Sequence, residues 1–465
     1  MADGFPRTES ESFANRRKAL AALLEGRAAL LAAGAPSPRN YPANAYPFRA
    51  SSHFLYLVGR AIPGAFVLVE AGGSTLFAEP PDRDDAIWHG PRPSLDELRA
   101  QLGIERVEPL ADLEARLRGR ADLATLPPQD HHTARTLAEL CGRTVLAGSG
   151  AKLTDERDVA LAEAMIAIRL AHDEAAKAQL RAAAQASAVA HVAGMRATKH
   201  AKGEAEVCAA ITAELRRRGM DDAYGPIVTV HGEILHAHGH EGALTPGDLL
   251  LCDVGGESHE GWASDITRTW PVTGRFSATQ RAIYDVVLDA NRRAIDKVRP
   301  GVSYRDAHET AKRAIVEGLV SLGILRGDVD GLLERGAANV FFPHGVGHLL
   351  GLDVHDMEDL GDRAGYAPGR TRSARFGDRY LRLDRDLVPG MAVTIEPGFY
   401  QVPGILADEA LVGPLGADLD RGILAKYADV RGIRIEDDVL CTNGDPEVMT
   451  ASCPKRAEEI EALMA

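Results

Sequence analysis

The chain has 465 residues, which predicts two domains rather than one. Its composition, 45% hydrophobic and 26% charged, is that of a water-soluble globular protein with enough apolar residues for a large core. The formal net charge of -14 argues against nucleic acid or an anionic membrane as the main partner, because both favour a basic surface.

The N-terminal region contains an arginine pair followed by apolar residues, as a twin-arginine export signal does. Arg16 and Arg17 precede an apolar run from Ala19 to Ala33. Glu25 and Arg27 interrupt this run, and its leucines recur at the spacing of an amphipathic helix. Nowhere does an apolar stretch reach the roughly 18 residues needed to span a bilayer. The five cysteines are scattered without C-x-x-C spacing, which favours reduced thiols in a cytoplasmic protein.

Helical and strand-like segments alternate from about residue 13 to residue 148. Gly64 to Pro80 predicts a hairpin with a Gly-Gly turn, and Leu110 to Arg120 predicts a helix. A long helical tract follows from about residue 152, with Thr154 as its expected N-cap. We therefore expect a small α/β domain over residues 1–152 and a second domain over residues 153–465.

The second domain also alternates helices and strands, so the predicted fold class is α/β (α+β) throughout. Ser277 to Gln280 forms a capping box that opens a helix running to about Val298. The strand candidates are the segments IVTV, DLLLCDVGG, ITRTWPV, MAVTIEPG and GIRIEDDVL. Residues 357–385 are polar and rich in arginine and glycine, which predicts a long loop, and such loops are usually functional or disordered.

The segment from Phe341 to Asp356, FFPHGVGHLLGLDVHD, concentrates histidine. His344, His348 and His355 lie within it among glycines that let the backbone approach a ligand closely. A single histidine in such a run is more often a satisfied core residue. Three of them favour a site for metal ligation or proton transfer.

Four carboxylates accompany strand candidates in this domain. Asp253 and Asp265 belong to two strand segments joined by a loop, so they can meet across a ladder. Glu396 and Glu436 alternate with aliphatic residues, so each strand buries one face and turns a carboxylate to the other. A carboxylate near a core must be paired or metal-bound, because an unpaired buried charge is costly. The alternative is that these carboxylates are unrelated and that each is solvated separately. This explanation fits a single residue well but fits the whole set poorly.

Carboxylates with one imidazole form a ligand set for hard or borderline divalent ions. Oxygen ligands favour Mn or Mg, and a single histidine leaves Zn, Co and Fe possible. Four negative charges exceed what one divalent ion balances, so we expect two ions, with Mn2+ as the first choice. Two ions about 3.5–4 Å apart can share a hydroxide that attacks a carbonyl carbon.

The segments LLLCDVGG, ASDITRTW, HGVGHLLGLDVHD, TIEPG and RIEDDV together resemble the proline-directed branch of the pita-bread metallopeptidases, which holds prolidase and aminopeptidase P. The resemblance covers most of the chain, including YPFRASSHFLYLVG in the N-terminal domain. It implies an aminopeptidase P-like N-terminal domain that serves dimerisation and partly closes the active-site mouth. A pita-bread (creatinase/aminopeptidase-like) catalytic domain follows, and a homodimer or larger homo-oligomer is expected.

The resemblance also implies a metal-ligand set. Asp253 binds one metal ion, Asp265 and Glu436 bridge the pair, and His348 and Glu396 hold the other ion. Glu396 also assists proton transfer from the nucleophilic water or bridging hydroxide.

Outside the ligands, the resemblance assigns residues to the substrate. His236, His344 and His355 match the family's outer histidines, which position the substrate and stabilise the tetrahedral intermediate. Arg434 supports a metal-bridging carboxylate or the substrate.

Two proline-directed activities are compatible with these motifs. Prolidase cleaves Xaa-Pro dipeptides, whereas aminopeptidase P removes the first residue from longer peptides. The segment RYLRLDRDLVPGM is similar to the prolidase segment whose arginine grips the proline carboxylate, and Arg382 is the matching position. The alternative for Arg382 is a solvated arginine among several in the same loop. The sequence favours prolidase, acting on a proline-containing dipeptide or short peptide, with aminopeptidase P as the alternative.

Other classes fit less well. A non-catalytic peptide-binding pita-bread module is a remote alternative, because such relatives lose metal ligands and this chain keeps all five. Creatinase-type enzymes lack the metal set, and methionine aminopeptidase lacks the large N-terminal domain.

Overall fold

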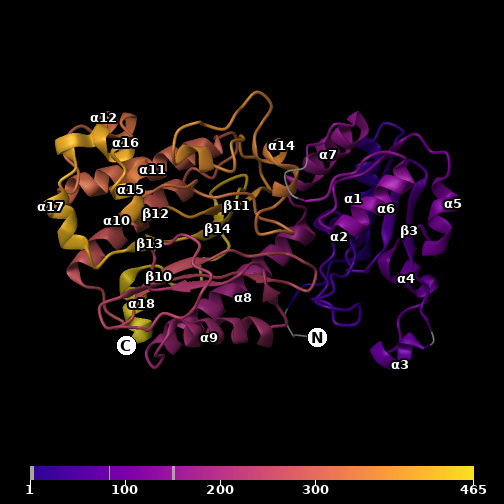
Figure 1. Ribbon diagram of the computed structural model, residues 1–465, viewed down its shortest axis with the longest axis horizontal. Coiled ribbons are helices and arrows are strands. Elements are labelled where there is room, and N and C mark those ends of the chain that lie inside the picture. The colour runs from indigo at the N-terminus through magenta and orange to yellow at the C-terminus, as the bar shows by residue number, and fades with distance from the viewer. Residues whose placement is uncertain (1–4, 83, 149–151) are drawn as a thin grey trace. The chain divides into compact units, whose positions relative to one another are not determined.

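A computed structural model describes residues 5–82, 84–148 and 152–465. The chain forms two compact units (Figure 1). The smaller unit contains Arg7–Ala175 and Met357–Ala364, and the larger is built mainly from Ala176–Asp356 and Gly365–Ala465. The division at residue 152, with the roles given to each side, stays a prediction.

The smaller unit is organised around a five-stranded sheet with the order β4-β3-β2-β1-β5. Its strands are β1 (Ala28–Ala32), β2 (Phe66–Glu70), β3 (Gly73–Ala78), β4 (Arg106–Pro109) and β5 (Leu123–Ala124). β1 pairs antiparallel with β2, as β2 does with β3, while β1–β5 and β3–β4 are parallel. The predicted hairpin is confirmed, with Glu70 paired to Gly73 at its turn.

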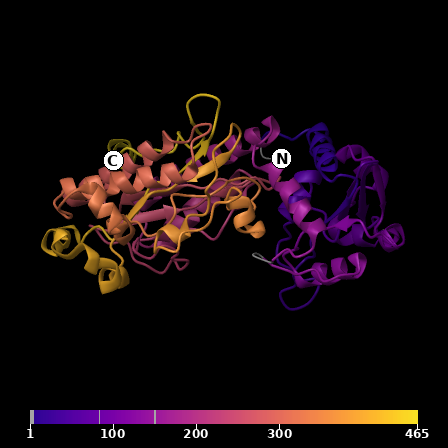
Figure 2. The same cartoon turned by 90° about the horizontal axis from the view of Figure 1, so that it is seen from above.

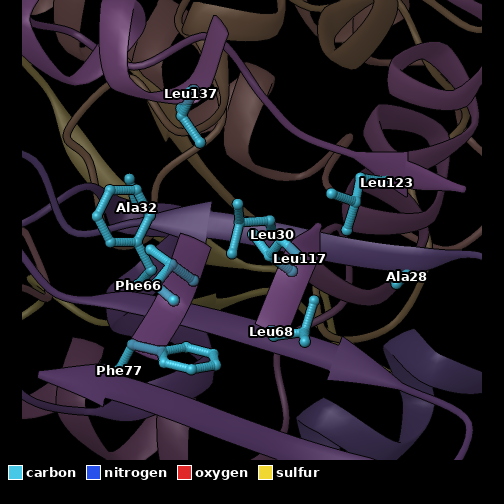
Figure 3. Close-up of a cluster of buried hydrophobic side chains, with 10 residues drawn as sticks. Ala28, Leu30, Ala32, Phe66, Leu68, Phe77, Leu117, Leu123 and Leu137 are labelled. Atoms are coloured by element: carbon cyan, nitrogen blue, oxygen red, sulfur yellow. The ribbon is translucent and has the colours of Figure 1, made fainter. Parts of the chain in front are cut away.

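Helices accompany this sheet and close its core. They are α1 (Ser10–Leu23), α2 (Ser52–Val58), α3 (Asp85–His89), α4 (Leu95–Leu102), α5 (Leu113–Leu117), α6 (His131–Cys141) and α7 (Glu156–Arg169). The helix predicted over 110–120 is shorter, a 3-10 turn followed by α5. Figure 3 shows the core, where Leu30 and Leu68 of neighbouring strands lie near Phe77, Leu117 and Leu137.

The prediction of one helix over the apolar run 19–33 is wrong. α1 ends at Leu23, and Leu30 lies in β1. Between them Glu25 and Gly26 have φ angles of 50° and 86°, a left-handed turn that ends the helix. All of β1 is buried, and a short, fully buried strand cannot be told from a helix by its periodicity.

The arginine pair before that run has a structural role. The Nε of Arg16 donates to Asp173 Oδ2 at 2.8 Å, and Arg17 Nη1 donates to the Leu57 carbonyl at 2.8 Å. Both arginines are buried. Among the described residues no helix is both long and apolar enough to cross a membrane.

The helical tract predicted after residue 152 forms two helices, α7 and α8 (Glu174–Thr198). Asp155, one residue beyond the predicted Thr154, caps α7 by accepting a hydrogen bond from the Arg157 backbone N–H.

The larger unit contains small sheets with the orders β10-β8-β7, β11-β14-β15, β12-β13 and β6-β9. The strands are β6 (Asp221–Asp222), β7 (Ile227–Thr229), β8 (Leu249–Asp253), β9 (Gly256–Glu257), β10 (Thr267–Pro271), β11 (Ala392–Ile395), β12 (Gly398–Tyr400), β13 (Gly432–Arg434), β14 (Asp437–Leu440) and β15 (Glu447–Val448). The predicted strands are all present, and GIRIEDDVL forms two of them.

The helices of this unit, besides α8, are α9 (Glu204–Arg217), α10 (Ala278–Ile295), α11 (Tyr304–Ser321), α12 (Val329–Glu334), α13 (Ala337–Phe341), α15 (Pro403–Leu406), α16 (Glu409–Val412), α17 (Arg421–Leu424) and α18 (Ala457–Met464). The capping box predicted for α10 is confirmed. The Ser277 hydroxyl accepts from the Gln280 backbone N–H, and the Gln280 side-chain oxygen accepts from the Ser277 backbone N–H. α10 packs against α11, and these are the salmon-coloured helices in Figure 2.

Residues 357–385 form the predicted long irregular segment. Short turns interrupt it: a 3-10 turn at Glu358–Leu360, α14 (Asp362–Gly365) and a 3-10 turn at Asp378–Tyr380. Its part from Gly365 onward belongs to the larger unit.

Candidate active site

Four predicted carboxylates lie where strands of the larger unit begin or end. Asp253 is the last residue of β8, and Asp265 lies just before β10. Asp253 is opposite Thr267 in the antiparallel β8–β10 pair. Glu396 follows β11, and Glu436 lies between β13 and β14, so a strand ladder fixes each backbone. The four strand ends therefore supply four carboxylates to one region.

Hydrogen bonds tie these strand ends to one another. The Glu436 backbone N–H donates to the Thr267 carbonyl at 3.0 Å, and the Thr267 hydroxyl donates to Glu436 Oε2 at 2.6 Å. The Asp265 backbone N–H donates to the buried carboxylate of Asp438 at 3.1 Å. The region is thus held by sheet geometry before any ligand binds.

The segment before His348 runs beside β11. The Thr394 backbone N–H donates to the His348 carbonyl at 3.0 Å, and the His348 N–H donates to the Thr394 hydroxyl at 3.1 Å. Gly347 makes this approach possible: its φ is +147°, and a Cβ there would lie 2.4 Å from the Thr394 carbonyl oxygen. Glu396 joins the same pairing through its N–H, which donates to the Val346 carbonyl at 2.8 Å.

The His348 imidazole is oriented as a metal ligand would be. Its Nδ1 lies 3.0 Å from the Leu349 carbonyl, which can only accept, so the ring proton is on Nδ1. The Nε2 lone pair then faces Asp265 Oδ2 at 3.4 Å and Glu396 Oε1 at 3.8 Å. Ligand atoms of Asp265, His348 and Glu436 all lie within 4.8 Å of one another.

Burial of several carboxylates together shifts their acidity. Desolvation raises the pKa of Glu396 to about 7 and that of Glu436 well above its usual range, and it also raises the pKa of Asp253. Asp265 is buried too, but a hydrogen bond from the His348 ring in its protonated form, and one from the Tyr224 hydroxyl, lower its pKa. So many carboxylates in one dry site need cations, and the oxygen donors with one imidazole fit divalent metal ions.

Metal-free protein is expected to become less stable as the pH rises from about 4.5 to about 7. Over that window folded Glu396 keeps a proton that the unfolded glutamate has released, so the unfolding free energy falls with pH, by about 1–3 kcal/mol. Urea unfolding of chelator-treated protein at several pH values measures this, and Glu396→Gln should flatten that part of the profile. A wild-type profile no steeper than that of the variant would contradict the expectation.

A network behind the carboxylates includes two tyrosines that the sequence did not single out. The Tyr224 hydroxyl lies 2.6 Å from Asp253 Oδ1 and 2.5 Å from Asp265 Oδ1. Arg434, predicted as a supporting residue, donates through Nη2 to Asp253 Oδ2 at 2.6 Å and through Nη1 to the Tyr400 hydroxyl at 2.9 Å. Tyr224 is 29 residues from Asp253 in the sequence, so the fold brings it here, whereas Tyr400 lies in β12, shortly after Glu396.

His344 joins this network. Its Nδ1 lies 2.8 Å from the Gly345 carbonyl and its Nε2 lies 2.9 Å from the Tyr400 hydroxyl. Burial and the charge of Arg434 lower the pKa of His344 to about 3, so the ring is neutral. A continuous chain of donors therefore runs from Arg434 through Tyr400 and His344 to a backbone carbonyl.

The other predicted residues lie at the edge of this region. The ring of His355 is 4.0 Å from that of His348 between centroids. The His236 side chain is exposed, and partial desolvation together with the charges of Arg434 and Arg382 lowers its pKa. Arg382 is thus electrostatically coupled to His236.

A second group of possible ligands is found among the described residues, consisting of His308, Glu309 and Asp378. The Lys312 ammonium lies 2.8 Å from Asp378 Oδ1 and 3.3 Å from Glu309. An ammonium already occupies the cation position, so this group is an ion-pair cluster rather than a metal site.

Comparisons with known proteins agree with this arrangement. Residues 178–443 match the metallopeptidase family M24, and residues 13–125 match the aminopeptidase P N-terminal domain. A Coccidioides posadasii protein named "Probable Xaa-Pro aminopeptidase" is 33% identical over 90% of this chain and 88% of its own.

Solved structures match almost the whole chain. Pseudomonas aeruginosa aminopeptidase PepP has a TM-score of 0.81 and 33% identity, over 98% of each chain. Zn-substituted Escherichia coli aminopeptidase P in complex with product has a TM-score of 0.77 and 32% identity, over 99% of each chain.

These matches confirm the α/β fold and the family resemblance. The M24 match covers more than half of the chain, and the relatives at this level of identity are enzymes, so the non-catalytic alternative is not supported. The chain belongs to metallopeptidase family M24 and is a metallo-exopeptidase, dependent on divalent metal ions, with an aminopeptidase P N-terminal domain and a pita-bread catalytic domain.

Proposed function

We propose that this enzyme removes the N-terminal residue from peptides whose second residue is proline, as an Xaa-Pro aminopeptidase of the aminopeptidase P type. The relatives that match most of the chain carry this name. They support the alternative weighed from the sequence better than the favoured dipeptidase. The observation that carries the proposal is the convergence of Asp265, Glu396 and Glu436 on His348, with Asp253 held beside Asp265 by Tyr224 and Arg434.

The proposed ligands are Asp253, Asp265, His348, Glu396 and Glu436. We propose that they hold two divalent ions, with Mn2+ as the first expectation and Zn2+, Co2+ or Fe2+ as alternatives. Divalent ions bound here would polarise the scissile carbonyl and make water a nucleophile near neutral pH.

Glu396 is proposed as the acid–base residue. Desolvation raises the pKa of Glu396 in the metal-free site, and bound divalent ions would lower it again, so that the carboxylate is ionised and free to accept a proton, as a general base requires. Its Oε2 lies 3.7 Å from His344 Nδ1 and its Oε1 lies 3.8 Å from His348 Nε2, so it adjoins both proposed ligand and substrate groups.

The outer residues are proposed to bind substrate. His236 and His355 would donate to the peptide and to the negative charge that develops on its carbonyl oxygen. His344 would act together with Tyr400, to which it is hydrogen-bonded. Arg434 would hold Asp253 and Tyr400 in place.

Such a site suits prolyl bonds. The prolyl nitrogen carries no hydrogen, so peptidases that bind substrate as a β-strand lose one contact. Its cis and trans forms also present two shapes. A site that holds the scissile carbonyl and the free amino terminus avoids both difficulties.

An Xaa-Pro dipeptidase is the second candidate, favoured by the packing of the Arg382 segment against the residue after His344: a Cβ on Gly345 would lie 2.8 Å from Leu381 Cα. Arg382→Ala is expected to raise KM for Ala-Pro by about 10- to 100-fold, because a charge-assisted contact with the proline carboxylate would be lost. KM for longer substrates should change far less. Arg379→Ala, in the same segment and exposed, is the matched control. An equal effect on both substrates would remove Arg382 from carboxylate recognition.

The experiment that tests the proposed function compares kcat/KM for Ala-Pro-Ala and Ala-Pro with Mn2+ supplied. A preference for the tripeptide supports the aminopeptidase. A strong preference for the dipeptide would replace it with prolidase, and no cleavage of either would overturn both.

Assembly and location extend the same proposal. We propose a homodimer or larger homo-oligomer formed through the N-terminal domain, and a cytoplasmic enzyme that binds neither nucleic acid nor membrane. The net charge of -14 supports the last point.

A further inference from the structure

A buried amide on α10 contacts the backbone beside two of the proposed ligands. Asn291 Nδ2 donates to the Ile395 carbonyl at 3.1 Å and to the Ile435 carbonyl at 3.2 Å. Glu396 follows Ile395 directly in the sequence, and Glu436 follows Ile435. Asn291 and both isoleucines are fully buried. One side chain therefore joins the two strands at the points where they deliver these carboxylates.

The pattern of α10 favours an aliphatic residue at this position. Val287 and Leu288, one turn before Asn291, and Ala294 and Ile295, one turn after it, are all buried. An amide among them costs free energy unless its polar atoms are hydrogen-bonded, and asparagine forms helices less readily than leucine or alanine. The contacts of Asn291 with the strands offset that cost.

The orientation of the amide follows from its partners. Asn291 Oδ1 accepts from Lys455 Nζ at 2.9 Å, and an ammonium can only donate. Lys455 is held in turn by Asp437 Oδ2 at 2.6 Å. The two carbonyl oxygens can only accept, so the amide nitrogen must face them. Its two hydrogens point in different directions, so one nitrogen atom can serve both strands.

Both peptide units are held at their other end as well. The N–H of Glu396, which belongs to the same planar peptide group as the carbonyl before it, donates to the Val346 carbonyl at 2.8 Å. The N–H of Glu436 donates to the Thr267 carbonyl at 3.0 Å. A planar group fixed on both sides leaves little freedom in the direction in which the next side chain projects. With Asn291 in place, both glutamates are aimed by their backbone.

A similar contact lies behind the other two strand-end carboxylates. The Nε2 of His191, on the buried face of α8, lies 2.9 Å from the carbonyl of Val254, which directly follows Asp253. The Val254 N–H donates at 3.0 Å to the carbonyl of Ile266, which directly follows Asp265. In both places a buried polar side chain on a helix holds the backbone next to proposed ligands.

We propose that Asn291 is a positioning residue of the metal centre, which sets the spacing of Glu396 and Glu436 by tying together the two peptide units that precede them. The inference rests on the proposed function, because it depends on the proposed ligand set. Two ionised carboxylates repel each other, and strands free to separate would have to be drawn together each time ions bound. Backbone that is ordered beforehand removes part of this cost, so the ions bind more tightly.

The test is a calorimetric titration of Mn2+ into metal-free, full-length protein. Asn291→Leu places an aliphatic side chain of similar size among the apolar neighbours and removes both donors. It should raise the Kd for Mn2+ about tenfold, the lower end of the range for losing a hydrogen bond behind a metal ligand. Mn2+ should then raise the urea midpoint of the variant less than that of wild type.

Gln280→Leu is the matched control on the same helix. Gln280 is 2% exposed, and its Nε2 donates at 2.7 Å to the carbonyl of Gly247, which is not next to any proposed ligand. If Asn291 were merely structural, both variants would lower the urea midpoint equally with and without Mn2+ and leave the Kd unchanged. The proposed role predicts a raised Kd for Asn291→Leu alone.

An unchanged Kd in folded Asn291→Leu, or the same rise in Gln280→Leu, would overturn the inference. Where Asn291→Leu fails to fold, Asn291→Ser replaces it, because one short hydroxyl cannot donate to both carbonyls, and its Kd must also rise. Failure of the proposed function is separate, since wild-type enzyme would then bind Mn2+ but leave Ala-Pro-Ala uncleaved. A wild-type Kd for Glu396→Ala would contradict the ligand set and the inference with it.

Discussion

Replacing Glu396 by alanine is expected to lower kcat/KM for Ala-Pro-Ala by about 10³-fold or more, because the substitution removes a proposed metal ligand and acid–base group together. Glu396 lies between His344 and His348, and burial raises its pKa to about 7. No other carboxylate has this combination of proposed roles. Steady-state kinetics with excess Mn2+ and metal analysis of the purified variant measure the effect.

Glu317→Ala is the control for this variant. Glu317 pairs with Arg293 on the surface of the larger unit, through Arg293 Nη1 at 2.6 Å, and its loss should leave kcat/KM unchanged. The Glu396→Ala protein should remain folded, because the substitution relieves a crowded group of carboxylates. A folded variant that retained wild-type activity would contradict the metal assignment.

Arg268→Ala is expected to lower the unfolding free energy by about 3–5 kcal/mol, since it breaks a buried ion pair and leaves its partners unsatisfied. Arg268 and Asp437 are fully buried and joined at 2.8 Å. The guanidinium also donates to the Pro454 carbonyl at 3.0 Å and the Cys453 carbonyl at 3.1 Å. Urea unfolding of wild type and variant with metal present measures the difference.

The exposed pair between Arg181 and Glu447 is the comparison for Arg268. Arg181 Nε lies 2.6 Å from Glu447 Oε1, with side chains 42% and 35% exposed. Arg181→Ala should cost no more than about 1 kcal/mol, as surface pairs do. Equal losses for the two arginines would show that burial does not set the strength of these pairs.

Much of the candidate site follows from local sequence pattern. Asp253, Glu396 and Glu436 stand where a β-branched or aliphatic run stops, and strand ends are places where a sheet delivers side chains to one region. Alternation along the strand predicted the position of Glu396 and Glu436, and the loop between two strands predicted that of Asp253. His348 followed from its density of neighbouring histidines and glycines, and Gly347 does make the close approach that such glycines allow.

The supporting residues could not be found in this way. Tyr224 meets Asp253 only through the fold, Tyr400 contacts Arg434 and His344, and a lone tyrosine carries no periodic pattern. One local error has the same origin. Leu30 continues the helical spacing of the apolar run, yet tertiary pairing with β2 draws it into a strand.

The local sequence pattern could not decide whether the enzyme is a dipeptidase or an aminopeptidase. Arg382 predicted a carboxylate contact, but a carboxylate contact alone does not exclude longer peptides from the site. The relatives, named aminopeptidases, favour the longer substrates.

The measurement that tests the central claim most directly is hydrolysis of Ala-Pro-Ala and Ala-Ala-Ala by enzyme of known metal content. We expect two divalent ions per chain, cleavage of Ala-Pro-Ala with release of alanine, and little cleavage of Ala-Ala-Ala. Chelation should abolish activity, and Mn2+ should restore it. Comparable cleavage of both peptides, or undiminished activity in the metal-stripped enzyme, would contradict a proline-directed metallopeptidase.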